Sequence, residues 1–187
     1  MILCLGRADL NPQEKIRTRS IPMPKSSKKS GKYAGRAGSR RTAKVLLRVF
    51  LDTSALVSGL NSTTGASGVI LLLFKFRKIS LLVSEEVIIE ANRVIQSKLP
   101  LLQAEFQNFL RGAPEIAPRI TPRDIRRALA ILDSEDTDIL AVALKSKADF
   151  LITLDKSFLA HIVNKTAVRA AYPGEFLAWY RATYINL

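Results

Sequence analysis

Residues 45–52 read VLLRVFLD, an apolar run that ends in an acid, and this run decides the predicted fold. Residues 149–155 (DFLITLD) repeat the pattern, and two further runs occupy residues 79–84 and, more weakly, 167–171. Continuous β-branched and aromatic runs of this length favour strands buried on both faces of a parallel sheet. Helical patterns fill much of the remaining sequence, at residues 67–78, 84–98, 101–110, 122–132, 137–147 and 173–184. Strands that alternate with helices predict an α/β domain with right-handed crossovers.

The composition of the chain excludes several classes of protein. With 187 residues, 48% of them hydrophobic and 24% charged, the chain can bury a sizeable core, so global disorder is excluded. The single cysteine, Cys4, can form neither an internal disulfide nor a thiolate zinc site. The longest apolar runs, such as residues 69–74, are too short to span a bilayer, so we expect no membrane partner.

The positive charge of the chain is concentrated near its start. The formal net charge is +13, from 29 Lys and Arg against 16 Asp and Glu. Residues 1–48 hold 13 of these bases and 2 acids, whereas residues 49–187 hold 16 bases and 14 acids. The sequence between 11 and 42 is rich in Lys, Arg, Ser, Gly and Pro and has no apolar period. We therefore expect a flexible basic arm at residues 1–43 and a nearly neutral domain at residues 44–187.

Three explanations of this arm stay open. It binds nucleic-acid phosphates with a strong salt dependence, it is an organelle transit segment, or it reflects a start codon assigned too far upstream. We expect a cytoplasmic protein, with organelle targeting by the arm as the alternative. Deleting residues 1–42 separates the explanations, because loss of a nucleic-acid-binding arm weakens nucleic-acid binding and flattens its salt dependence.

Acidic residues close two of the predicted strands. Asp52 ends the first run and Asp155 ends the third, and the carboxyl ends of parallel strands meet at one edge of a sheet. In the helix predicted to begin at Ser84, Glu90 borders the apolar stripe more closely than the acids of the first turn do. Glu90 is therefore expected to point toward the strand edge, and the alternative is a surface glutamate that pairs with Arg93.

Residues 133–138 (DSEDTD) are denser in acid than any other segment. Asp136 lies at i+3 and i+4 spacing from Ile139 and Leu140, on the apolar face of the following helix, whereas Asp138 falls on the opposite side. We therefore expect Asp136 to face inward and Asp138 to face outward. An inward carboxylate needs a partner charge or a metal, because burying an unpaired charge is costly.

The inward acids are then Asp52, Glu90, Asp136 and Asp155, and no base lies in the same motifs to neutralise them. Like charges this close repel one another unless a cation intervenes, and carboxylate oxygens suit Mg²⁺ or Mn²⁺. A carboxylate-bound ion that retains water generates a nucleophile and neutralises the charge that develops on a phosphodiester. The pattern therefore predicts hydrolysis of a nucleic-acid backbone.

The acids lie in segments whose order and spacing agree with those of a known family. These segments cover most of residues 45–180 and are 49–58 (VFLDTSALVS), 82–90 (LVSEEVIIE), 133–143 (DSEDTDILAVA), 148–159 (ADFLITLDKSFL) and, more weakly, 168–177 (VRAAYPGEFL). Taken together they resemble the PIN-domain family, and in particular its ribonuclease toxins of toxin–antitoxin pairs.

The resemblance implies both a fold and an activity. The fold would be a three-layer α/β/α domain with a central parallel sheet. The activity would be that of an endoribonuclease that depends on Mg²⁺ or Mn²⁺ and leaves 5′-phosphate and 3′-hydroxyl ends. The family's metal-binding and catalytic quartet would fall on Asp52, Glu90, Asp136 and Asp155. The implied partners are an RNA substrate, a cognate antitoxin protein and a second copy of the chain.

The chain departs from the family pattern at two places. Ser54 stands where the family often has Asn, and both residues are short polar groups. Around the third acid the family often has several Asp in a row, so the register stays open between Asp136 and Asp138, and the helical face favours Asp136.

Thr153, two residues before Asp155, matches a frequent family hydroxyl that orients a carboxylate or a water. The alternative for this threonine is an ordinary β-forming residue in a strand.

Other functions are weighed against this one. A phosphotransferase of the haloacid dehalogenase type also places Asp-Thr-Ser after a strand, but it needs a second Asp where this chain has Ser54. An inactive PIN-fold module that binds RNA or protein is the stronger alternative, although such a module has no reason to keep four repelling acids. His161 is the sole histidine, which leaves Ser/His/Asp and Cys/His triads without support. We expect Trp179 and Tyr180 of the last helix to make core or dimer contacts.

Overall fold

A computed structural model of the chain describes residues 46–162 and 165–185. The basic arm expected at residues 1–43 lies outside the described residues. Within them, no single helix is long and apolar enough to cross a membrane, and the one helix pair that would together reach that length is bent by 88°.

The centre of the domain is a parallel sheet, as the sequence predicts. Five described strands form it in the order β3-β2-β1-β4-β5, and every neighbouring pair is parallel. The strands are β1 (Arg48–Leu51), β2 (Ser80–Val83), β3 (Glu115–Ile116), β4 (Phe150–Ile152) and β5 (Arg169–Ala171).

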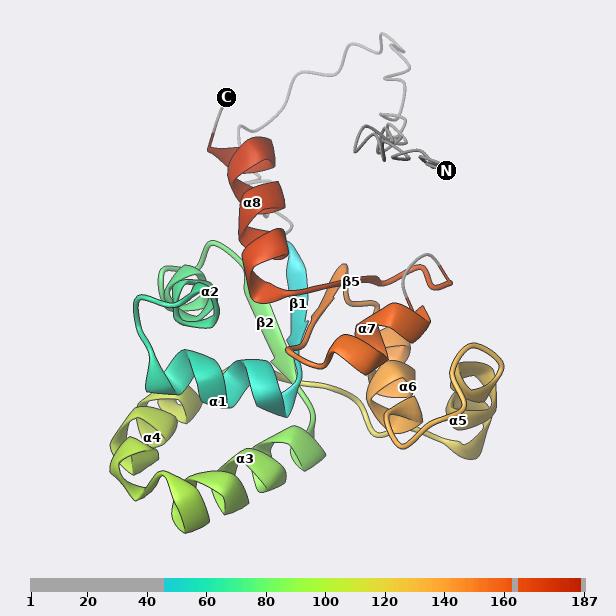
Figure 1. The fold of residues 1–187 in the computed structure, drawn as a ribbon, viewed down its shortest axis with the longest axis horizontal. Helices are drawn as coiled ribbons and strands as arrows, with labels where there is room; N and C mark the ends of the chain where they lie inside the picture. The colour runs from blue at the N-terminus through green and yellow to red at the C-terminus, as the bar shows by residue number, and fades with distance from the viewer. Residues whose placement is uncertain (1–45, 163–164, 186–187) are drawn as a thin grey trace, which may run out of the picture. The chain divides into compact units, whose positions relative to one another are not determined.

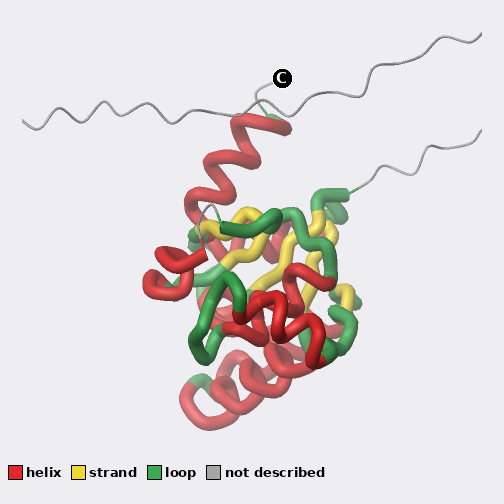
Figure 2. The backbone as a smooth tube through the Cα atoms, turned by 90° about the vertical axis from the view of Figure 1, so that its right-hand side faces the viewer, coloured by secondary structure: helices red, strands yellow, loops and turns green. Residues whose placement is uncertain are grey.

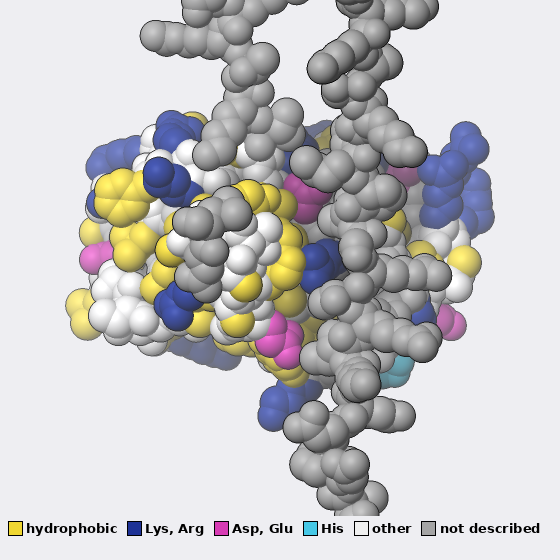
Figure 3. Space-filling view, turned by 90° about the horizontal axis from the view of Figure 1, so that it is seen from above, with side chains coloured by type: hydrophobic (Ala, Val, Ile, Leu, Met, Phe, Trp, Pro, Cys, Tyr) yellow, Lys and Arg dark blue, Asp and Glu magenta, His cyan; other side chains and the backbone are white. Residues whose placement is uncertain are grey.

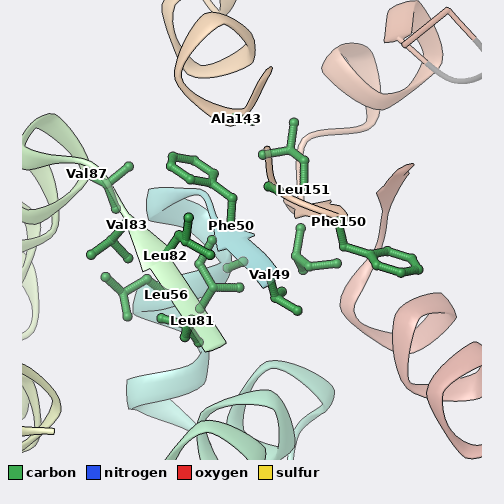
Figure 4. Close-up of a cluster of buried hydrophobic side chains, with 14 of the residues drawn as sticks. Val49, Phe50, Leu56, Leu81, Leu82, Val83, Val87, Ala143, Phe150 and Leu151 are labelled. Atoms are coloured by element: carbon green, nitrogen blue, oxygen red, sulfur yellow. The ribbon is translucent and has the colours of Figure 1, made fainter. Parts of the chain in front are cut away.

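Helices cover both faces of this sheet, so that the domain has the expected α/β/α layers. Figures 1 and 4 show α1 and α2 on one side of the strands and α6 on the other. The helices are α1 (Thr53–Asn61), α2 (Ala66–Lys75), α3 (Glu85–Lys98), α4 (Gln103–Arg111), α5 (Pro122–Leu129), α6 (Thr137–Lys145), α7 (Lys156–Ile162) and α8 (Pro173–Tyr184), with a 3-10 turn at Pro100–Leu102.

The core lies on both sides of the central strands. Val49, Phe50 and Leu51 of β1 are each 0% exposed, which explains why the run in the sequence is continuous rather than alternating. In Figure 4, Phe50 points to the side of Ala143 in α6, whereas Val49 points away from it. Burial on both faces therefore fixes β1 between two helical layers.

The aromatic residues of α8 belong to this core. Phe176 is fully buried, and its ring centroid lies 5.0 Å from that of Phe150. Trp179 lies 4.6 Å from the ring of Phe150, and Tyr180 lies 5.9 Å from that of Phe176. Trp179 and Tyr180 thus make the core contacts that were one of their two expected roles.

At the edge of the sheet where β1 begins, Arg48 contacts several separate parts of the chain. Its backbone N–H donates to Asp149 Oδ2 over 2.8 Å. Its guanidinium donates to both carboxylate oxygens of Glu115, over 3.0 and 2.6 Å, and to the carbonyl of Ser146 over 2.9 Å. This residue therefore joins β3, the end of α6 and the start of β4 to the central strand.

Several elements differ from the sequence expectations. The helices α1 and α7 and the strand β3 were not among the predicted elements. The helix expected at residues 67–78 ends at Lys75, and Arg77 adopts a left-handed backbone with φ 54°, which a helix cannot contain. The helix expected at residues 122–132 ends at Leu129.

Candidate active site

The candidate site lies where the strand order reverses. From β1 the chain moves outward to β2 and β3, then returns to β4 on the other side of β1 and continues to β5. Open parallel sheets bind ligands outside the carboxyl ends of the strands at such a point. Asp52 directly follows β1, and its backbone N–H donates to the carbonyl of Ile152, the last residue of β4, over 3.0 Å. The two central strands therefore deliver their following residues to one place.

The carboxylate of Asp52 is buried, at 7% exposure, and held by three donors. Its Oδ1 accepts a hydrogen bond from the backbone N–H of Thr53 over 2.7 Å, which caps α1. Its Oδ2 accepts from the hydroxyls of Ser54, over 2.8 Å, and Thr153, over 2.7 Å. A carboxylate has about four acceptor positions. Oδ2 is therefore saturated, and Oδ1 keeps one position open.

The same two hydroxyls also fix the backbone beyond β4. Each hydroxyl has a single proton, which both give to Asp52, so the 3.3 Å contact between Ser54 Oγ and Thr153 Oγ1 adds no hydrogen bond. Ser54 Oγ accepts from the N–H of Leu154 over 3.0 Å, and Thr153 Oγ1 accepts from the N–H of Asp155 over 3.0 Å. The start of α1 and the segment that carries Asp155 are thereby locked together.

Glu90 is an exposed residue of α3 that is turned toward α1. The hydroxyl of Thr53 donates to Glu90 Oε2 over 2.8 Å, and the helices α1 and α3 pack together. The helix begins as expected, with the Ser84 hydroxyl accepting from the N–H of Val87 over 3.2 Å. Within the described residues Glu90 forms no ion pair with Arg93, which was the alternative expected from the sequence. Its carboxylate is instead connected, through Thr53, to the surroundings of Asp52.

Asp136 is the half-buried residue at the start of α6, whereas Asp138, in the first turn, is exposed. Burial raises the pKa of Asp136 above its usual value, and the negative charges of Asp155, Asp52 and, last, Glu135 raise it further. Asp136 is therefore the acid of this group on which the neighbouring negative charges act. The role of Asp136 rather than Asp138 as the third acid stays a prediction.

Asp155 has a structural task at the same edge. Its Oδ1 accepts from the backbone N–H of Phe158 over 2.9 Å, which caps the first turn of α7. The residue is exposed rather than inward as expected, because it follows β4 by three residues and begins a surface helix, and its charge raises the pKa of Asp136 after the effect of burial. Asp155 therefore has two roles, as the cap of α7 and as a negative charge near Asp136.

The donor chemistry of the site fits a hydrated divalent ion. Across residues 46–162 and 165–185, no three Asp, Glu, His or Cys side chains come together as a metal-binding group. Mg²⁺, however, keeps several waters and is usually bound through one or two carboxylates. The open position on Asp52 Oδ1 and the repulsion felt by Asp136 suit such an ion, because a cation relieves that repulsion. Asp52 and Asp136 are the residues whose surroundings fit this ion, and ligation by Asp155 and Glu90 stays a prediction.

Thr53 is the functional residue that sequence reasoning missed. It stands between two of the four acids in space, with its N–H on Asp52 and its hydroxyl on Glu90. Its position directly after the first acid was the available signal. Thr153 was expected to orient a carboxylate or a water, and it does donate to a carboxylate, that of Asp52. Ser54 was singled out only as a short polar group, and its bond to the same carboxylate could not be read from the sequence.

Comparisons with known proteins identify the family and the fold. A family model described as "PIN domain" matches residues 48–157. No curated protein matches the chain significantly.

Solved structures resemble the fold at 18% sequence identity, a level that shows the fold alone. PAE2754 from Pyrobaculum aerophilum aligns with a TM-score of 0.53 over 73% of this chain and 97% of its own. VapBC2 from Rickettsia felis, bound to a DNA fragment from its promoter, aligns with a TM-score of 0.50 over 67% and 98%. DNA-bound VapBC from Salmonella typhimurium aligns with a TM-score of 0.50 over 68% and 99%.

Proposed function

The chain belongs to the PIN-domain family, and we propose that it is a metal-dependent endoribonuclease that hydrolyses RNA phosphodiester bonds. One observation carries the proposal. Asp52, at the point where the strand order reverses, is fixed by three donors, keeps one open oxygen position, and lies close enough to Asp136 to raise its pKa. A rigid carboxylate among repelling carboxylates is an arrangement suited to a divalent cation.

In this mechanism the residues of the chain would position the divalent ion and the attacking water. Asp52, Asp136 and Asp155 would hold Mg²⁺ or Mn²⁺, and Glu90 would be a further ligand or the base that orients the attacking water. When bound, the ion supplies Lewis-acid activation of water and neutralises the phosphodiester. Ser54 and Thr153 hold Asp52 in one orientation, and Thr53 holds Glu90. Such preorganisation lowers the barrier because little needs to move as charge develops.

We further propose that the chain acts as the toxin of a toxin–antitoxin pair. Two of the similar folds are VapBC assemblies, and the domain spans 98% and 99% of the chains compared. A cognate antitoxin is accordingly the proposed protein partner, and a homodimer is a proposed assembly state. Growth arrest on expression of the chain alone, relieved by co-expression of the adjacent reading frame, tests the pairing.

One observation favours a second candidate, an inactive PIN-fold module that binds RNA or protein. No three described acids converge as a metal-binding group, and Asp155 is in part committed to capping α7. A module of this kind would keep the fold and bind its partner without hydrolysis. It would also show no response to Mg²⁺ or Mn²⁺.

The decisive experiment is an RNA cleavage assay with Mg²⁺, with Mn²⁺ and with EDTA. Wild type is expected to cleave with either ion and to stop in EDTA, whereas Asp52→Asn and Asp136→Asn lose activity. The matched control is Asp138→Asn, which removes one exposed acid two residues from Asp136. Full activity of Asp52→Asn would overturn the proposal, and loss with Asp138→Asn but not Asp136→Asn would move the third acid to Asp138.

A further inference from the structure

The outward face of α5 carries a cluster of arginines. Arg123, Arg126 and Arg127 are exposed and stand at i, i+3 and i+4, so they share one side of the helix. Ala128, on another side, is 0% exposed and belongs to the core. We call these three residues the α5 arginine face.

No acid neutralises this face within the described residues. Asp124, the acid of the same helix, is occupied by Lys145 Nζ at 2.8 Å and by the Thr121 hydroxyl at 2.6 Å. The ion pairs that arginines form in the described part of the chain are Arg48–Glu115 and Arg119–Glu85. The guanidinium groups of the α5 arginine face thus have no carboxylate within ion-pair distance there. They leave three uncompensated positive charges on a domain whose sequence is otherwise nearly neutral.

The face runs along α5, with Arg123 in the first turn and the other two arginines toward the end that leads to Asp136. The Lys145–Asp124 ion pair joins the last residue of α6 to the first turn of α5, and the two helices pack together. The short segment 130–136 connects the end of α5 to the start of α6 and carries Asp136. Arg126 and Arg127 are in the last turn of α5. In Figure 1 the two helices stand next to each other at the right-hand side, and Figure 2 views the domain from that side.

The space-filling view (Figure 3) shows basic side chains on the side of the domain that carries α5. Figure 3 shows a group of Lys and Arg side chains at the right-hand edge, the side on which α5 lies in Figure 1. We propose that the α5 arginine face binds the phosphates of single-stranded RNA and leads the strand to the acids beside Asp136. The proposal takes its polymer from the proposed function, but the surface itself is argued from the charges and the packing of α5.

The chemistry of the face favours a polyanion as its partner. An acidic site repels phosphate, so a substrate strand needs attraction from a neighbouring surface. Guanidinium groups bind phosphate oxygens with two parallel hydrogen bonds, and neighbours at i+3 and i+4 stand about 5–6 Å apart between Cβ atoms. The exposed large apolar side chain of α5 is Leu129, at 42% exposure, and a single such side chain is less than the apolar centre that anchors a protein partner.

The test compares two triple variants of the full chain with the same loss of charge. Arg123→Gln/Arg126→Gln/Arg127→Gln removes the α5 arginine face. The matched control, Lys75→Gln/Arg111→Gln/Arg181→Gln, removes three exposed bases from α2, α4 and α8. Binding of a fluorescent oligouridylate of about 20 nucleotides is followed by anisotropy in EDTA over a series of salt concentrations. Equal thermal melting of the three proteins shows that each is folded.

The α5 variant is expected to lose roughly tenfold in affinity, and its salt slope should fall by up to about 2, because each lost phosphate contact lowers the slope by about 0.7 on a single strand. The control should keep most of the wild-type affinity and slope. Equal affinities and slopes in the two triple variants would overturn the inference, whatever the basic arm contributes, since both variants retain it.

The outcome separates this inference from the proposed function. If the wild type does not cleave RNA and the α5 variant has a reduced salt slope, the proposed nuclease function is wrong and the RNA-binding surface stands. If the wild type cleaves RNA and the α5 variant has an unchanged salt slope and an unchanged KM, the nuclease function stands and the inferred binding surface is wrong. Loss of antitoxin binding without any change in RNA binding assigns the face to a protein and also overturns the inference.

Discussion

The hydroxyl of Thr53 donates a hydrogen bond to Glu90 Oε2 over 2.8 Å and thereby connects the start of α1 to the second turn of α3. The backbone N–H of the same residue donates to Asp52 Oδ1 over 2.7 Å. One residue thus sets the distance between an acid that follows a strand and an acid that lies on a helix. Thr53 is buried, at 7% exposure, whereas Glu90 is exposed, so this link is only partly shielded from water.

Thr53→Val keeps the shape of the side chain and removes its donor. We expect a small loss of stability, about 1 kcal/mol, since Glu90 is exposed and water can replace the hydroxyl. The loss of kcat should be larger, roughly tenfold to a hundredfold, because Glu90 is no longer held in place. Thr53→Ser restores the donor and should restore most of the rate. Equal rates for the Val and Ser variants would show that the link has no positioning role.

Divalent ions should stabilise the folded protein. A ligand present at about 100 times its Kd adds about 2.7 kcal/mol, which raises the Tm of a domain of this size by about 5–10 °C. We expect this shift with Mn²⁺ for wild type and for the control Asp133→Asn, an exposed acid of the same loop. Asp52→Asn should abolish it. Thermal melting in Mn²⁺ and in EDTA measures the effect, and an unshifted wild type would contradict a metal site.

The ion pair between α5 and α6 predicts a pH dependence of stability. The hydrogen bond from Lys145, followed by those from Thr121, holds the pKa of Asp124 well below its ordinary value of 3.8. The stabilisation from this carboxylate is therefore fully present above about pH 4 and is lost as the pH falls through the lowered pKa. Asp124→Asn should be less stable than wild type at pH 7, and the difference should shrink below pH 4. Urea unfolding at both pH values checks this.

Lys145→Gln provides the partner variant for that measurement. It removes the first cause of the lowered pKa, so its stability should follow pH in the same way as that of Asp124→Asn. The double variant should be little worse than either single variant, because both remove one interaction. A stability gap that stays constant from pH 7 to pH 3 would contradict the assignment.

Two glycines should respond oppositely to alanine. A Cβ on Gly68, in α2, would collide with the carbonyl oxygen of Ser62 and the backbone of Thr63. Gly68→Ala should therefore lose about 1–3 kcal/mol, or more if the loop cannot move. A Cβ on Gly174, in α8, meets nothing within 4 Å, so Gly174→Ala should gain up to about 1 kcal/mol from its helix propensity. The Tm values of the two variants measure both effects, and a neutral Gly68→Ala would show that α1 and α2 are less closely joined.

Much of the sheet could be predicted, because its central strands are buried on both faces. The bounds of α8, Pro173–Tyr184, agree with the predicted helix, since Pro173 stands at its first position and Glu175 bonds back to the N–H of Tyr172. By contrast, α1 begins on the residue after Asp52, and no turn residues separate it from β1. The strand β3 has two exposed residues and exists through its pairing with Leu82 and Val83, which no local pattern encodes.

In the candidate site, too, some features could be predicted from the sequence and others could not. That Asp52 and Asp155 follow neighbouring strand ends could be predicted from the parallel topology alone. The bond from Thr153 to Asp52 joins residues 101 positions apart, and it depends on the register that pairs Leu51 with Ile152. The helical stripe left Glu90 open between an inward and a surface position, and its exposure with a bond to Thr53 depends on how α3 packs against α1.

The contacts of Arg48 bear on the order in which the domain assembles. Its partners Glu115, Ser146 and Asp149 lie 67, 98 and 101 residues along the chain. These bonds cannot close until both halves of the sheet have docked, so they belong to the last stage of folding. Removing the guanidinium should then accelerate unfolding and leave the refolding rate nearly unchanged. Arg48 is therefore expected to slow the unfolding of the native domain, so that its main contribution is to kinetic stability.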